Sequence, residues 1–62
     1  MPRYRFTGSD APEGEESDFD SDSAAESAAR ERSSSAQVVV TVHRHSGHVE
    51  AWEYVTEVDE RQ

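Results

Sequence analysis

The sequence predicts an α+β fold in which a small antiparallel β-sheet, built from an N-terminal strand and a C-terminal β-hairpin, carries one short helix on one face. Three patterns predict it. Apolar and polar residues alternate over 2–7, a helix-capping motif opens an alanine-rich segment at 23–32, and two extended segments flank a Ser-Gly turn within 37–58. The predicted order is therefore β-α-β-β, in a single small domain over residues 1–62.

The N-terminal strand is predicted from a period of two. Tyr4 and Phe6 would share one face, and the other face would carry Arg3, Arg5 and Thr7. This alternation is typical of a strand that buries one face and exposes the other.

An acidic segment follows this strand. Between residues 8 and 22 the chain has no basic residue, and its like charges, its proline and its glycines oppose regular structure. We therefore interpret residues 8–17 as a flexible acidic loop, and we expect Phe19 to anchor the chain that follows on the core. The acidic side chains form a candidate patch that consists of Asp10, Glu13, Glu15, Glu16, Asp18, Asp20 and Asp22.

A short helix is predicted after this loop. Ser23 and Glu26 have the S-x-x-E spacing of a capping box, in which each side chain accepts a hydrogen bond from the backbone amide of the other residue. The apolar stripe of this segment contains only alanine, so the helix can approach a sheet closely although it buries little surface. The serines at 33–35 are expected to end it.

The C-terminal half predicts a β-hairpin. Residues 37–45 are mostly β-branched, Ser46 and Gly47 are typical of a turn, and 49–58 form a second extended run. The last residues, 59–62, are expected to fray.

A two-residue turn would set the register of this hairpin, with His45 opposite His48. Alternation then gives a valine face and an aromatic face. The valine face carries Val38, Val40, Val42, Ala51 and Val55, and the aromatic face carries Val39, Thr41, His43, His45, His48, Glu50, Trp52 and Tyr54. Glu53 falls on the valine face, a conflict that a bulge or another register would relieve.

The aromatic face is the main functional candidate. Since the alanine helix suits the valine face, Val39, Thr41, Trp52 and Tyr54 would be left uncovered. An exposed apolar patch that contains tryptophan and tyrosine is typical of an interface. We expect these four residues to mediate protein–protein association, most simply as a homodimer. The alternative is that the helix covers this face and that Trp52 and Tyr54 form the core.

The chain is strongly acidic, with 14 aspartate and glutamate residues, six basic residues that are all arginine, and a formal net charge of −8. An acidic surface repels nucleic acid and anionic membranes, so we expect direct binding of neither. One interpretation is adaptation to high salt, in which ions screen the repulsion. The other is an acidic mimic of nucleic acid that inhibits a basic protein through Asp10–Asp22 and Glu57–Glu60.

Three histidines and a glutamate are candidate metal ligands. His43, His45, His48 and Glu50 share the aromatic face near the hairpin tip, and imidazole and carboxylate groups are suitable ligands for zinc, copper or nickel. A divalent metal would also stabilise so short a chain. The alternatives are a pH-sensitive surface or plain solvated turn residues, with no cofactor.

Catalytic motifs are missing from the sequence. It contains no cysteine, no G-x-S-x-G, no glycine-rich phosphate loop and no H-E-x-x-H, so we expect no enzyme activity and no catalytic residue. No apolar run resembles a signal peptide or a membrane span, which predicts a cytoplasmic protein. The predicted role is binding, either to a second copy of the chain or to another protein.

Overall fold

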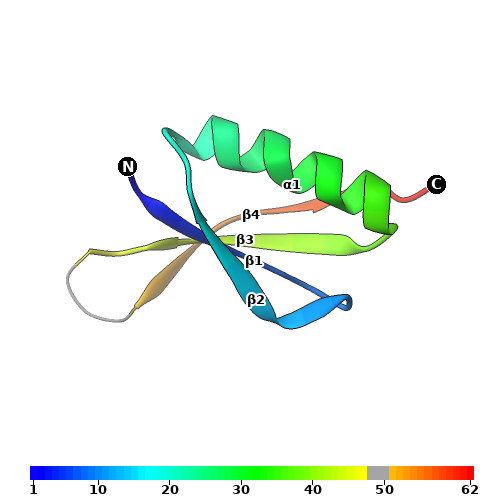
Figure 1. Ribbon diagram of the computed structural model, residues 1–62, viewed down its shortest axis with the longest axis horizontal. Coiled ribbons are helices and arrows are strands. Elements are labelled where there is room, and N and C mark those ends of the chain that lie inside the picture. Colours follow the sequence, from blue (N-terminus) through cyan, green and yellow to red (C-terminus); the bar gives the residue numbers. More distant parts are fainter. Residues whose placement is uncertain (48–50) are drawn as a thin grey trace.

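The computed structural model describes residues 1–47 and 51–62, which form an antiparallel sheet covered on one face by a helix (Figure 1). The four strands lie in the order β2-β1-β3-β4. The elements along the chain are β1 (Arg3–Gly8), β2 (Ala11–Asp18), α1 (Asp22–Ala36), β3 (Val39–His45) and β4 (Trp52–Asp59). The predicted α+β class, with one helix on a small antiparallel sheet that includes a C-terminal hairpin, is confirmed.

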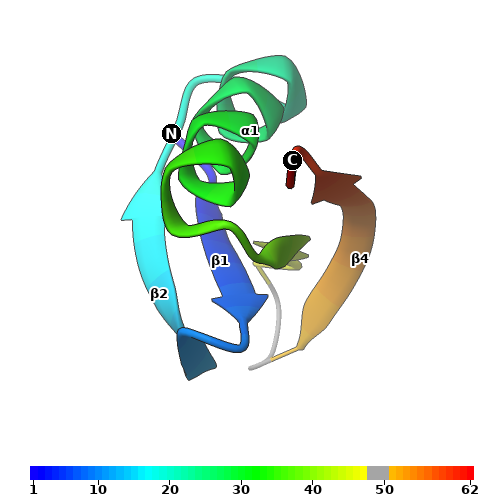
Figure 2. The same ribbon diagram turned by 90° about the vertical axis from the view of Figure 1, so that its right-hand side faces the viewer.

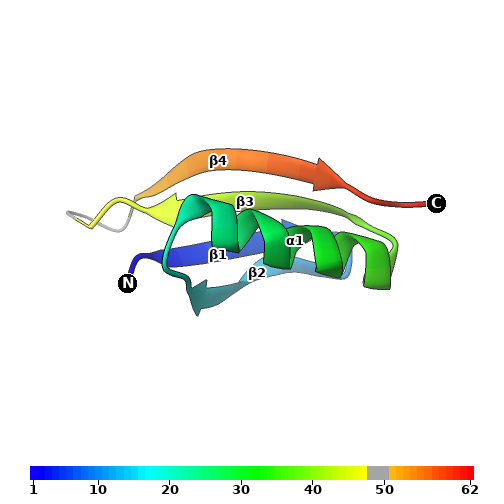
Figure 3. The same cartoon turned by 90° about the horizontal axis from the view of Figure 1, so that it is seen from above.

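Residues Ala11–Asp18 form strand β2, although a loop is predicted there. The interpretation of residues 8–17 as a flexible loop is wrong, because Ala11–Asp18 pair with β1 and form one edge of the sheet (Figure 3). The register sets Arg5 opposite Glu16 and Arg3 opposite Asp18. Cross-strand pairs of opposite charge are favourable, so the arginines of β1 offset the repulsion that made this segment resemble a loop.

Helix α1 begins two residues earlier than predicted. Ser21 is the N-cap, and its Oγ accepts a hydrogen bond from the backbone N–H of Ala24 at 3.1 Å. The predicted capping box at Ser23 is therefore wrong, since Ser23 lies inside the helix. A cap at Ser21 makes Asp22 the first helical residue, where its negative charge suits the positive end of the helix dipole.

The helix also extends through the serines that were expected to end it. It continues to Ala36, and Gln37 closes it with a left-handed backbone at φ 57° and ψ 48°. The side chain of Ser33 is fully buried and hydrogen bonded, so it does not compete with the helix for backbone groups.

The core lies between α1 and the sheet. Figure 2 shows the helix over one face of the curved sheet, with no helix on the other face. The buried apolar residues are Tyr4, Phe6, Ala25, Ala29, Val38, Val40, Val42 and Val58. The helix thus covers the valine face, as predicted, and the predicted anchor Phe19 stacks on Phe6 with ring centroids 5.6 Å apart.

The register of the hairpin differs from the prediction. His45 pairs with Trp52 instead of His48, and His43 pairs with Tyr54. A bulge then shifts the register, so that Val42 pairs with Thr56. This bulge turns Val58 into the core, where strict alternation would have placed it on the aromatic face.

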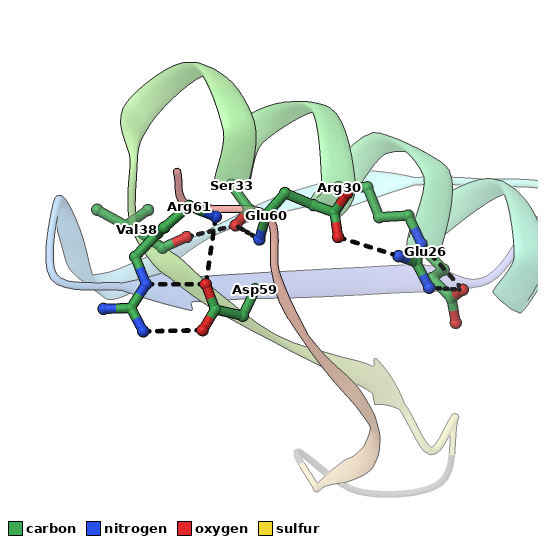
Figure 4. A network of polar contacts seen from close by, with 7 residues as sticks. All are labelled: Glu26, Arg30, Ser33, Val38, Asp59, Glu60 and Arg61. Carbon is green, nitrogen blue, oxygen red and sulfur yellow. Dashed lines mark hydrogen bonds and ion pairs between the residues drawn. The ribbon is translucent and has the colours of Figure 1, made fainter.

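The C-terminal residues, which were predicted to fray, are tied to the end of α1. Asp59 is the last residue of β4, and the next backbone N–H, that of Glu60, donates to Ser33 Oγ at 2.7 Å (Figure 4). The backbone N–H of Gln62 donates to Gln37 Oε1 at 2.9 Å. Both acceptors, Ser33 and Gln37, belong to the last turn and the C-cap of α1, which continues to Ala36.

The described part of the chain has no helix that is long and apolar enough to cross a membrane.

Candidate functional site

The candidate site is the open face of the sheet, defined as the face opposite α1. Side chains alternate between the two faces of a strand, and directly paired residues share a face. The open face therefore carries Arg3, Arg5, Thr7, Glu16, Asp18, Val39, Thr41, His43, His45, Trp52, Tyr54, Glu57 and Asp59. The predicted interface residues Val39, Thr41, Trp52 and Tyr54 all lie on it.

One row of side chains crosses all four strands of the open face. Glu16 pairs with Arg5, Arg5 with His43, and His43 with Tyr54. The rings of His43 and Tyr54 meet edge to face, with centroids 6.0 Å apart. A second, parallel row is formed by Thr7, Thr41 and Glu57.

Arg5 and Trp52 form the centre of this face. The guanidinium carbon of Arg5 lies 4.2 Å from the centroid of the Trp52 ring, a cation–π contact that joins β1 to β4 across β3. The ring of His45 also contacts Trp52, edge to face, with the ring centroids 5.1 Å apart. Trp52 is half-buried as a result, although no residue of α1 covers it.

Arg5 has hydrogen-bonding capacity to spare. Its Nη2 lies 3.4 Å from Glu16 Oε2, and its buried Nε has no hydrogen-bond partner. The arginine stem lies against Gly14, where an added Cβ would meet Arg5 Cγ at 2.7 Å. Gly14 also has φ +89°, a conformation that favours glycine.

Tyr54 is the most exposed part of the open face. It is 64% exposed, which makes it one of the two large apolar side chains that stand out from the described surface. A tyrosine in this position presents both a ring and a hydroxyl to a binding partner.

The predicted acidic patch is largely neutralised by arginine. Arg32 binds Asp10 and Glu15, Arg3 binds Glu16 and Asp18, and Arg44 binds Asp22. Only Glu13 and Asp20 of the patch make no ion pair with a described residue. All arginines of the chain take part in ion pairs, including Arg30 with Glu26 and Glu60 (Figure 4) and Arg61 with Asp59.

Glu53, which conflicted with the predicted valine face, is also neutralised. It pairs with Arg44 in the sheet register, and Arg44 Nη2 lies 3.1 Å from its Oε2. Arg44 thus joins a carboxylate of β4 to Asp22 at the start of α1.

Tyr4, Asp22 and Arg44 form a polar network at the beginning of the helix. Tyr4 Oη donates to Asp22 Oδ1 at 2.5 Å, and Arg44 Nη1 donates to Asp22 Oδ2 at 2.6 Å. The Arg44 and Tyr4 hydrogen bonds hold the pKa of Asp22 below its usual value. Burial and the Asp22 carboxylate raise the pKa of the Tyr4 hydroxyl.

The proposed metal ligands are only partly placed. His43 and His45 lie on the open face against Tyr54 and Trp52, whereas His48 and Glu50 lie outside the described residues. Over residues 1–47 and 51–62, no three histidine or acidic side chains are arranged to hold a metal ion. No cavity is found in this part of the structure.

Sequence reasoning missed three residues that shape this face. Arg5 was placed on the correct face, but its contact with Trp52 requires β1 to lie beside β3, which no local pattern indicates. Gly14 was taken for a loop signal, and Glu57 was linked only to an acidic tail.

No family model, curated protein or solved structure matches this chain.

Proposed function

We propose that this protein is a non-catalytic association module whose open face binds a second copy of the same chain. The observation that carries the proposal is the uncovered aromatic face, on which Trp52 and Tyr54 lie beside His45 and His43 and Tyr54 is 64% exposed, while Thr41 and Val39 continue the same face further along β3. Tyrosine, tryptophan and arginine are enriched at protein interfaces and dominate their binding energy.

The size of the core supports a partner of the same kind. The core contains two aromatic residues, with valines and alanines as its other members, and small domains without disulfides or metals commonly gain stability by oligomerisation. Two-fold dimers are the commonest soluble oligomers, and they need only one surface that fits itself.

The surface charge supports a salt-adapted module. The acidic residues outnumber the arginines, and the arginines are already held in ion pairs, so Glu13, Asp20, Glu31 and Glu57 remain without a described cation. The acidic-mimic interpretation is weaker, because most acids of its proposed patch face arginines instead of solvent alone.

Sedimentation equilibrium and light scattering test the proposal. We expect wild-type chain to have the mass of two copies, and Tyr54→Ser to shift it toward one copy while leaving its circular dichroism spectrum unchanged. Glu31→Ala, at an exposed position of α1, is the matched control and should remain dimeric. A wild-type protein that stays monomeric up to about 1 mM, the weakest range of specific association, would contradict the proposal.

A further inference from the structure

We propose that the two copies pack open face to open face with their strands running in opposite directions, so that Arg5 of each copy binds Glu57 of the other. This inference rests on the proposed self-association and specifies its geometry. It depends on three observations: an arginine with unused donors, an unpaired carboxylate on the same face, and the placement of the arginine's guanidinium group and of the carboxylate on either side of Tyr54.

The arginine is held in place but incompletely bonded. Its guanidinium lies over Trp52 at 4.2 Å, its contact with Glu16 is long at 3.4 Å, and its buried Nε has no hydrogen-bond partner. The side chain is still 32% exposed. The buried Nε is out of reach, but a carboxylate that approaches from outside would supply a charge-assisted acceptor to the exposed part of a guanidinium whose position is already fixed.

The carboxylate is Glu57 of the partner copy. Glu57 pairs with Thr41 in the sheet, so it lies on the open face, and it is exposed. It makes no ion pair with any residue in the described part of its own chain, in contrast to Glu53 and Asp59 on the same strand.

The spacing along β4 makes the face complementary to itself. Trp52, with Arg5 above it, lies on one side of Tyr54, and Glu57 lies on the other side. A two-fold axis that passes near Tyr54 and runs across the strands exchanges these two sides. It therefore brings each Arg5 to the partner's Glu57 and each Tyr54 to its own counterpart, as an isologous interface requires.

The other simple arrangement lacks this match. A two-fold axis that runs along the strands places each cross-strand row of one copy against the same row of the other copy, with the order of the strands reversed. An axis between β1 and β3, for example, would place Arg5 against His43 and would set Glu57 of β4 over the acidic strand β2, so that Glu57 would not reach Arg5. Burying unpaired charges opposes association.

Charge reversal tests this geometry. We expect Arg5→Glu and Glu57→Arg each to weaken self-association at least about tenfold, because each homodimer would then contain two contacts between like charges. An equimolar mixture of the two variants should form heterodimers with near wild-type affinity, since both contacts become attractive again. The double variant R5E/E57R should likewise recover homodimers.

Glu31→Arg on α1 makes the same charge change away from the open face and should leave association unchanged. Sedimentation velocity reports the affinities, and circular dichroism of each variant reports folding, so that an unfolded variant is recognised and the pairing is judged from the mixture and the double variant. A monomeric wild type would overturn the proposed function itself. A wild-type dimer with no recovery in the mixture and the double variant would overturn only the Arg5–Glu57 geometry.

Discussion

The hydroxyl of Ser33 lies 2.7 Å from the backbone nitrogen of Glu60 and accepts a hydrogen bond from it. The same hydroxyl donates to the carbonyl oxygen of Val38 at 2.6 Å (Figure 4). Ser33 is fully buried, so one side chain joins the end of α1 to the chain before β3 and to the chain after β4.

We expect Ser33→Ala to lower the free energy of unfolding by about 1–3 kcal/mol, because it leaves the buried carbonyl of Val38 and the partly buried N–H of Glu60 without this partner. Urea denaturation followed by circular dichroism measures the loss. Ser34→Ala, at an exposed position of the same helix, has the same effect on helix propensity and isolates the contribution of the hydrogen bonds. Equal stability of the two variants would contradict the role of this hydroxyl.

Gly14→Ala should displace Arg5 from Trp52. An alanine there would be strained by its positive φ and would also meet Arg5 Cγ at 2.7 Å. Gly47→Ala is the matched control, since Gly47 has φ +88° but nothing within 4 Å of an added Cβ. We expect both variants to lose stability through backbone strain, by about 1 kcal/mol or more. Gly14→Ala should change the fluorescence of Trp52 more than Gly47→Ala does, because Gly47 is linked to Trp52 indirectly, through its hydrogen bond to His45.

The Asp22 network predicts a specific acid dependence. Because hydrogen bonds in the folded state lower the pKa of Asp22, its contribution to stability is present above the carboxyl range near pH 4 and is lost as the pH falls through the lowered pKa. The destabilisation caused by Asp22→Asn should therefore be largest near neutral pH and shrink toward pH 2. Asp59, whose pKa is lowered to about 2 by Arg61, should still contribute in that range.

Urea titrations at several pH values test this dependence. The control is Asp20→Asn, which removes an exposed carboxylate that has no ion pair in the structure. A destabilisation by Asp22→Asn that is constant between pH 7 and pH 2 would show that the negative charge of Asp22 makes no net contribution to stability.

Salt should stabilise the fold. Surface ion pairs contribute only about 0–1 kcal/mol each, and salt screens them, but it also screens the repulsion among the excess acids. With a net charge of −8, we expect the second effect to dominate and the melting temperature to rise between about 0.1 M and 2 M KCl. Neutralising Glu13, Asp20 and Glu31 together should flatten this rise. A melting temperature that falls with salt would argue against salt adaptation.

The sheet face covered by the helix could be predicted because it depends on local alternation. Val38, Val40 and Val42 share a face in any register, and so do Tyr4 and Phe6. Trp52 and Tyr54 lie on the predicted face although the predicted register is wrong. The predicted and observed pairing partners of these two residues differ by an even number of positions along β3, and such a shift leaves a side chain on the same face.

The remaining features depend on contacts between distant segments. β2 forms because its acids meet the arginines of β1, and the bulge in β4 follows from bringing Val58 into the core. The cap at Ser21 likewise accompanies contacts of Asp22, the first helical residue, with Tyr4 and Arg44. Local sequence patterns carry no information about these contacts between distant segments.

The two outer strands of the sheet limit how copies can assemble. β2 contains Pro12, which has no backbone N–H, together with several acids, and β4 is interrupted by the bulge beside Val55. Both features interrupt the regular row of backbone groups that an incoming strand would need, which opposes edge-to-edge joining of sheets into a filament. Any assembly of this chain through its broad surface would stop at a closed, finite particle.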